Sequence, residues 1–115
     1  AGRTGIIGFC WGGSLAWLSA CRQGPDCAVG YYGGQIAGFA AERPRCPVQL
    51  HFGGKDASIP VADVEAIGAA HPEIPVHLYL EAGHGFNCDR RASHHPESAA
   101  LSWERTLDFL TENLG

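Results

Sequence analysis

Short apolar segments alternate with longer helix-forming segments along most of the chain. The apolar segments are residues 4–9, 27–32, 48–52 and 75–80, and turn-forming or polar residues follow each of them. Their apolar residues stand at consecutive positions rather than at every second one, a pattern typical of strands buried on both faces of a parallel sheet. We therefore expect an α/β fold whose sheet carries helices on both faces.

Three segments between or after these strands predict helices. The first covers residues 14–21 and follows a tight glycine turn, and the second starts near Pro60 and ends at about His71. The third has Pro96 in its first turn and runs to Gly115. Apolar residues at spacings of four, three and four give this last helix a stripe that we expect to face the sheet: Trp103, Leu107, Leu110 and Leu114.

Composition sets limits on the class of protein. The chain has 115 residues, of which 45% are hydrophobic and 17% charged, so we expect one globular domain over residues 1–115. The formal net charge is -4, and no basic stripe is present to bind a nucleic acid. The apolar runs are interrupted well before the roughly 20 residues that a membrane-spanning helix needs, so no membrane segment is expected.

The cysteines indicate a reducing, cytoplasmic compartment. There are five, an odd number, and none forms a Cys-x-x-Cys pair. Cys21, Cys27 and Cys46 are interpreted as small buried hydrophobic residues.

Cys10 differs from the other cysteines because of its neighbours. The segment 8–12, Gly-Phe-Cys-Trp-Gly, fits the nucleophile-elbow pattern G-x-S-x-G with cysteine in place of serine. We expect Gly8 and Gly12 to prevent collisions between the strand and the helix at this turn. A helix N-terminus favours a thiolate, and the backbone N–H of Trp11 is expected to donate to an oxyanion.

A histidine and a carboxylate follow later strands at the same predicted edge of the sheet. Asp56 comes after the third strand and His84 after the fourth, which gives the chain order nucleophile, acid, histidine of α/β-hydrolases. A turn or helix-capping carboxylate is the alternative interpretation of Asp56. His51 and His77 lie within strands and are interpreted as packing or surface residues.

Other motifs are weaker. Tyr31 and Tyr32 end the second strand, and we expect the first in the core and the second in a substrate pocket. Cys88, His94 and His95 match no compact zinc spacing with His84, so no metal site is expected. The glycine turn also does not fit a dinucleotide loop, G-x-G-x-x-G, and no cofactor is expected.

Four motifs in order resemble the dienelactone hydrolase family of α/β-hydrolases, over essentially the whole chain. They are residues 8–13 (GFCWGG), 28–33 (AVGYYG), 51–56 (HFGGKD) followed by Pro60, and 83–86 (GHGF). The resemblance implies that Cys10 is the nucleophile, Asp56 the acid and His84 the base. It also implies that the chain corresponds to the carboxyl-terminal half of a family member, whose upstream half holds the first strands and the second oxyanion donor.

The function that the resemblance implies is hydrolysis of an ester or lactone, of the carboxymethylenebutenolidase type, through a thioester on Cys10. Tyr32 and Phe86 are the expected substrate contacts. The family has an arginine shortly after its histidine to hold a substrate carboxylate, whereas Cys88 stands four residues after His84 in this chain. Arg90 and Arg91 are the nearby candidates to replace it.

Two alternatives remain at this stage. A thioesterase or general carboxylesterase of the same fold would use the same three residues. A catalytically silent chain would instead associate with a second copy or another polypeptide through an exposed sheet edge.

Overall fold

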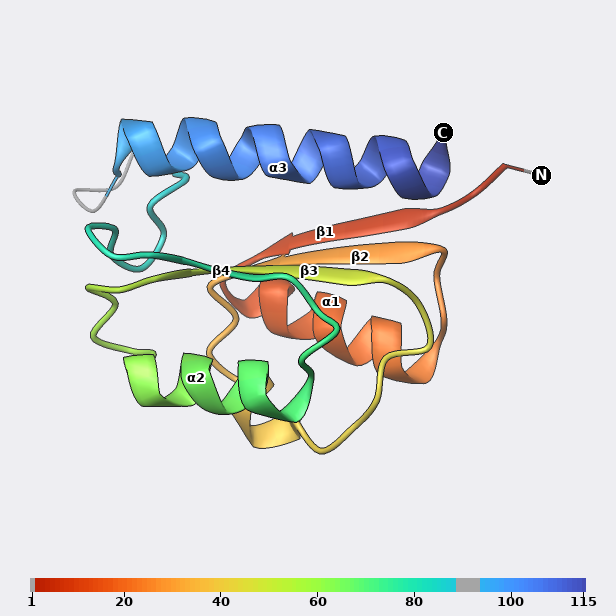
Figure 1. The fold of residues 1–115 in the computed structure, drawn as a ribbon, viewed down its shortest axis with the longest axis horizontal. Helices are drawn as coiled ribbons and strands as arrows, with labels where there is room; N and C mark the ends of the chain where they lie inside the picture. The colour runs from red at the N-terminus through yellow and green to blue at the C-terminus, as the bar shows by residue number, and fades with distance from the viewer. Residues whose placement is uncertain (1, 89–93) are drawn as a thin grey trace.

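The four apolar segments form one parallel sheet, which confirms the expected fold class. In the computed structural model, which describes residues 2–88 and 94–115, the strands lie side by side in chain order (Figure 1). Each strand pairs in parallel with the next. The strands are β1 (Gly5–Phe9), β2 (Cys27–Tyr31), β3 (Val48–Gly53) and β4 (Val76–Tyr79).

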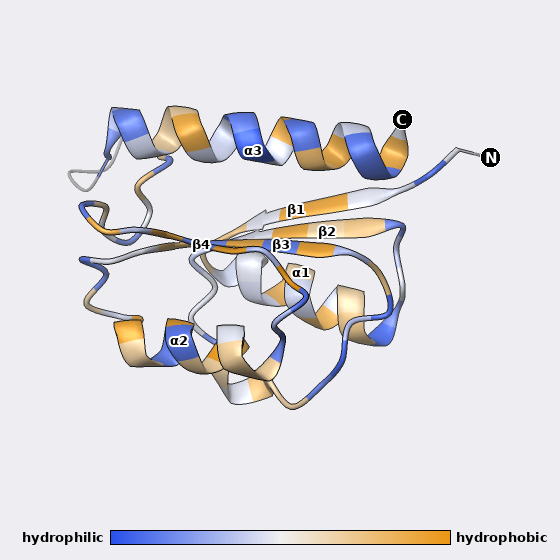
Figure 2. Cartoon of the chain, viewed as in Figure 1, coloured by the Kyte–Doolittle hydropathy of each residue, from blue (hydrophilic) through white to orange (hydrophobic). Residues whose placement is uncertain are grey.

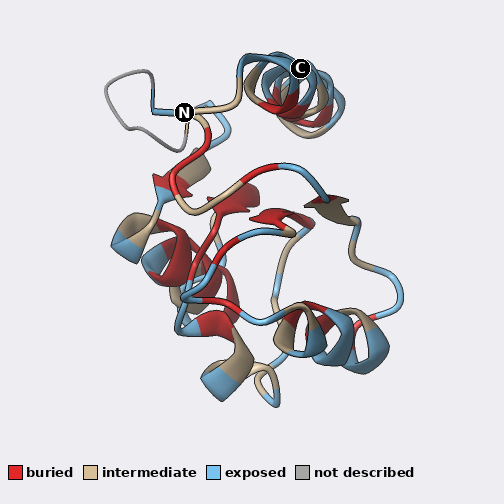
Figure 3. Cartoon of the chain, turned by 90° about the vertical axis from the view of Figure 1, so that its left-hand side faces the viewer, coloured by how far each residue is buried: buried red, intermediate tan, exposed pale blue. Residues whose placement is uncertain are grey.

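Helices cover both faces of this sheet, as predicted. Helices α1 (Trp11–Arg22) and α2 (Val61–Ala70) lie on one face, and α3 (Pro96–Leu114) lies across the other (Figure 1). A short 3-10 helix, η1 (Ile36–Phe39), packs near α1 and α2. Every residue of β2 and β3 is buried, and Figure 3 shows the buried residues concentrated in the sheet and on the helix surfaces that face it.

Strand β1 forms one edge of the described sheet and is less buried than β2 and β3. Large apolar side chains are exposed close to it, namely Phe9 (38% exposed), Trp11 (66%) and Leu15 (46%). Association of the chain through this edge stays a prediction.

Helix α1 starts earlier than the sequence pattern indicated. It begins at Trp11, directly after Cys10, so Gly12 and Gly13 lie inside its first turn rather than in a loop before it. A helix tolerates glycine in its first turn because tertiary contacts, here with β1 and β2, outweigh a weak intrinsic propensity.

The predicted apolar stripe of α3 is wrong for its first half. Trp103 and Leu107 are 41% and 48% exposed, whereas the face buried against the sheet carries Ser98, Ser102, Thr106 and Phe109. Figure 2 shows hydrophilic and hydrophobic residues alternating along this helix. Leu110 and Leu114 do pack against the core, next to Gly5. The helix presents hydroxyl groups to the sheet because the sheet carries buried polar groups at that place.

His51 is the centre of this buried polar network. Its side chain is fully buried, and its ring stacks on Tyr31 and His77 with centroid distances of 4.5 and 5.3 Å. Its Nδ1 lies 2.8 Å from the Tyr79 hydroxyl, and its Nε2 lies 2.8 Å from Oε1 of Gln49. Both ring nitrogens therefore have partners, as a buried polar side chain requires.

The partners of this network determine the direction of each hydrogen bond. The Arg105 guanidinium only donates, so the Tyr79 hydroxyl 3.3 Å away accepts from it and gives its own proton to His51 Nδ1. The amide nitrogen of Gln49 donates to the Arg105 carbonyl at 3.3 Å, which leaves Oε1 to accept from His51 Nε2–H. His51 is thus neutral, with its proton on Nε2, in a ring of bonds that begins and ends at Arg105.

A pH dependence of stability follows from this network. Burial lowers the pKa of His51 from 6.5 to about 3, so the unfolded chain binds the proton more readily than the folded one. We expect the free energy of unfolding to fall as the pH drops from 6.5 towards 3, with His51 contributing at most about 1.4 kcal/mol per pH unit. Urea unfolding at a series of pH values measures this slope.

His51→Gln is the informative variant for that measurement. It should be less stable near neutral pH, because it disturbs the network, and its stability should depend less steeply on pH. The pKa of His77 is also lowered by burial, so part of the slope should remain. Equal slopes for both proteins would contradict the assignment to His51.

Candidate active site

Cys10 occupies a strained position between β1 and α1. Its backbone angles are φ 55 and ψ -120, a conformation that side chains other than glycine rarely adopt. Cys10 N donates to the Tyr31 carbonyl (3.0 Å), and the Cys10 carbonyl accepts from the backbone N–H groups of Gly13 (2.9 Å) and Ser14 (3.3 Å). Such strain persists only where the surroundings enforce it, and it is concentrated at functional sites.

The glycines around Cys10 have different roles from those expected. A Cβ at Gly8 would overlap the carbonyl group of Gly12, and a Cβ at Gly13 would overlap the carbonyl oxygen of Tyr31. A Cβ at Gly12 would meet no atom within 4 Å. The steric prediction is therefore confirmed for Gly8 and wrong for Gly12, because the helix starts at Trp11 and directs position 12 away from the strand.

Asp56 and His84 form a hydrogen-bonded pair at the carboxyl edge of the sheet. Nδ1 of His84 donates to Oδ2 of Asp56 at 2.6 Å. The other carboxylate oxygen of Asp56 accepts from the backbone N–H of Ser58 at 2.8 Å. The Asp56 side chain is fully buried, whereas that of His84 is 27% exposed. The carboxylate therefore fixes the imidazole orientation and holds its Nδ1 proton.

The two loops that carry this pair are attached to each other. Lys55 N donates to the Ala82 carbonyl at 2.9 Å, and Gly54 N donates to the Tyr79 carbonyl at 2.8 Å. Position 53 requires glycine where the two loops cross, since a Cβ there would overlap the Ala82 carbonyl oxygen. Gly53, the last residue of β3, and Gly54 thus allow the close approach of the Asp56 loop to the His84 loop.

A cavity of about 370 Å³ opens beside Cys10 at the same edge. Tyr32 lines it and has a positive φ of 38, so two strained residues border one cavity. The Tyr32 ring also contacts the His84 ring, with centroids 5.2 Å apart. The lining residues are Phe9, Cys10, Tyr32, Asn87 and Cys88.

The other predicted site residues lie in different surroundings. Tyr31 is fully buried in the core, as expected. Phe86 is fully buried, and its ring packs on those of Tyr32 and Tyr79 with centroid distances of 5.2 Å, while its contact with a substrate stays a prediction. Trp11 is the first residue of α1, so its N–H is among those that have no acceptor within the helix. Arg90 and Arg91 lie outside the described residues.

Three cavity residues were not predicted as such. Phe9 ends β1, and Asn87 and Cys88 belong to the turn after His84. The available signal was the short distance along the chain, since Asn87 and Cys88 stand three and four residues after His84 in a glycine-containing turn.

The remaining cysteines are mostly core residues. Cys21 and Cys27 are buried and Cys46 is half-buried, and burial raises the pKa of all three thiols, to about 11 for Cys21. All five cysteines are described, and none is in a disulfide. Among residues 2–88 and 94–115, no cluster of three or more His, Cys, Asp or Glu side chains is arranged to hold a metal ion.

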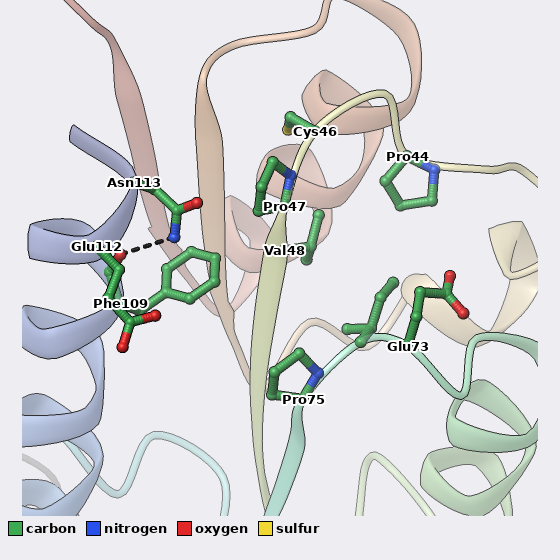
Figure 4. A pocket seen from close by; sticks show the side chains of 10 residues that line it. Pro44, Cys46, Pro47, Val48, Glu73, Pro75, Phe109, Glu112 and Asn113 are labelled. Atoms are coloured by element: carbon green, nitrogen blue, oxygen red, sulfur yellow. Dashed lines mark hydrogen bonds between the residues drawn. The ribbon is translucent and has the colours of Figure 1, made fainter.

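A second cavity, of about 360 Å³, lies at the opposite end of the sheet, where β3 and β4 begin (Figure 4). Pro47 and Pro75, which precede these strands, line it together with Phe109 and Glu112 of α3. Ligands of open α/β sheets bind at the carboxyl ends of the strands, so this cavity is not the expected catalytic site.

None of the helices in the described part of the chain is both long enough and apolar enough to cross a membrane.

The sequence is similar to that of one known protein family. Residues 1–114 match the model of the dienelactone hydrolase family. The chain is 39% identical over 114 residues to a carboxymethylenebutenolidase of Pseudomonas putida, covering 95% of this chain and 48% of that protein. It is 38% identical over 126 residues to a candidate carboxymethylenebutenolidase of Yersinia pestis, and the match covers 96% of this chain and 47% of that protein.

Solved structures agree with the sequence relatives. The crystal structure of a candidate dienelactone hydrolase from Klebsiella pneumoniae superposes with a TM-score of 0.85 at 36% identity, covering 93% of this chain and 51% of that one. The chain thus spans about half the length of the curated relatives it matches.

Proposed function

Because the chain belongs to the dienelactone hydrolase family, we propose that it carries the catalytic nucleophile, acid and histidine of a hydrolase that cleaves an ester or lactone. The observation that supports this most directly is the 2.6 Å hydrogen bond between His84 and the buried Asp56. That pair lies at the same sheet edge as the strained Cys10, beside a cavity large enough for a small acyl compound.

In the first half of the proposed reaction, Cys10 transfers its proton to Nε2 of His84 and its sulfur attacks the carbonyl carbon of the substrate. A carbon–sulfur bond forms, and the carbonyl electrons move to the oxygen, to which the Trp11 N–H donates. When the carbonyl re-forms, the bond to the alcohol oxygen breaks, and His84 gives its Nε2 proton to the leaving alkoxide. The product is a thioester on Cys10.

In the second half, His84 accepts a proton from water, whose oxygen attacks the thioester carbon. The carbon–sulfur bond breaks, the carboxylic acid leaves, and Cys10 returns as the thiolate or, with the histidine proton, as the thiol. Asp56 holds the Nδ1 proton throughout and stabilises the imidazolium form. Nε2 is therefore the nitrogen that exchanges protons with the substrate and with water.

Alkylation tests the proposed nucleophile. At about pH 7, iodoacetamide should label Cys10 before the other four cysteines, because a helix N-terminus and a nearby histidine favour the reactive thiolate. Hydrolysis should be lost in proportion to the fraction of Cys10 that is labelled. Assays with activated esters, thioesters and lactones also show which of these three substrate classes is hydrolysed fastest. Peptide mass spectrometry at short reaction times locates the label.

His84→Gln should slow the labelling of Cys10 without slowing that of Cys88. Cys88 is the appropriate internal reference, since it is exposed and lines the same cavity. Labelling of several cysteines at the same rate, or full activity after Cys10 is alkylated, would contradict the proposal.

A further inference from the structure

Two thiols, from distant parts of the sequence, line the cavity at the candidate active site. Cys10 comes from the elbow between β1 and α1, and Cys88 comes from the turn after His84. A backbone hydrogen bond from Cys88 N to the Gly85 carbonyl (2.9 Å) closes that turn, in which Gly85 has a φ of 74. The catalytic assignment uses only the first of these thiols.

Tyr32 lines the cavity together with both cysteines. Burial raises the pKa of its hydroxyl group above the ordinary value, and negative charge on Cys10 and on Cys88 raises it further. Electrostatic influence from both thiols on one buried hydroxyl agrees with their position around the same cavity.

The other cysteines are less suited to thiol–disulfide exchange. Exchange needs a thiolate and access to the reagent, whereas burial keeps Cys21, Cys27 and Cys46 in the thiol form by raising their pKa. Cys88 is exposed, and Cys10 stands at the start of a helix, where a thiolate is favoured.

We propose that Cys10 and Cys88 are a disulfide-forming pair, through which a low-molecular-weight disulfide reversibly blocks the nucleophile. The inference rests on the proposed function for the reactivity of Cys10. A disulfide brings the two Cβ atoms to about 4 Å, so the pairing requires the elbow and the turn, which line one cavity, to approach to that distance.

The reaction has two exchange steps. The Cys10 thiolate attacks one sulfur of the small disulfide, whose S–S bond breaks, so that a mixed disulfide forms on Cys10 and one thiolate leaves. The Cys88 thiol loses its proton to water and attacks the Cys10 sulfur, which forms the Cys10–Cys88 bond and releases the second thiolate. Two electrons pass from the protein to the small disulfide, which becomes two thiols after taking up two protons.

Glutathione disulfide is a suitable probe. The reduced protein is first assayed for ester hydrolysis, then incubated with glutathione disulfide near neutral pH, blocked with N-ethylmaleimide and digested without reduction. We expect a mass loss of two hydrogen atoms, a peptide pair linking Cys10 to Cys88, loss of nearly all hydrolysis, and recovery with dithiothreitol.

Two variants make the result specific. Cys88→Ser should stop at a glutathione adduct on Cys10, whereas Cys46→Ser should still form the Cys10–Cys88 link. A lasting adduct on Cys10 of the unsubstituted protein, or a link to another cysteine, would overturn the pairing. If the link forms but the reduced protein hydrolyses no ester, only the catalytic proposal fails; if the reduced protein is active but no link forms, only the pairing fails.

Discussion

Asp56→Asn should lower kcat for ester hydrolysis by roughly ten-thousandfold, the order found when the triad aspartate of a serine protease is changed to asparagine. The Ser58 N–H only donates, so the amide oxygen of the asparagine must take the place of Oδ1. Its NH2 group then faces Nδ1 of His84, which has to accept rather than donate. The histidine proton moves to Nε2, where it prevents His84 from accepting a proton from Cys10.

This expectation concerns the chemical step, so the measurement should separate kcat from KM. We expect KM to change little, because Asp56 is buried and does not line the cavity. Asp63→Asn, in the first turn of α2, removes the same charge away from the site and should leave kcat unchanged. A kcat for Asp56→Asn within a few-fold of the unsubstituted value would remove Asp56 from the mechanism.

The strands and their parallel arrangement could be predicted from the sequence because buried parallel strands have few alternatives. Runs of consecutive apolar residues marked all four, and the structure differs only by a residue or two at their ends. The edge from which Asp56 and His84 emerge followed from the same argument, since parallel strands all end at one side of a sheet.

The packing of α3 could not be predicted in the same way. A helical stripe of Leu and Trp usually faces the core, but here the sheet presents the buried polar side chains of Gln49 and His51 to the helix. The helix meets them with Ser102 and Thr106, and the Thr106 hydroxyl accepts from that of Tyr31 at 2.7 Å while donating to the Ser102 carbonyl. No single-segment pattern contains this requirement, because it arises from residues about 55 positions apart.

Some features of the candidate site also could not be predicted, because they depend on contacts between segments that are distant in the sequence. The G-x-C-x-G spacing located the elbow, but the backbone strain at Cys10 and at Tyr32 depends on contacts between loops. Phe86 was expected as a substrate contact; the sequence alone does not show that its ring is fully buried and packs on Tyr32, which lines the cavity.

Gly8→Ala should destabilise the fold by about 4 kcal/mol or more, which is a large part of the total stability of a small domain. The added methyl group would overlap the backbone of Gly12, at the first turn of α1, and a backbone neighbour cannot rotate away as a side chain does. To make room, α1 would have to move off the strand on which it packs, and Cys10 would lose its strained conformation. Circular dichroism and soluble yield measure the result.

Gly12→Ala is the matched control, because it makes the same substitution in the same motif. A methyl group there meets nothing within 4 Å, and alanine favours a helix over glycine by up to about 1 kcal/mol. This variant should be as stable as the unsubstituted protein or slightly more so. Equal destabilisation of the two variants would mean that both motif glycines are needed for space, and that α1 approaches β1 differently from the geometry described above.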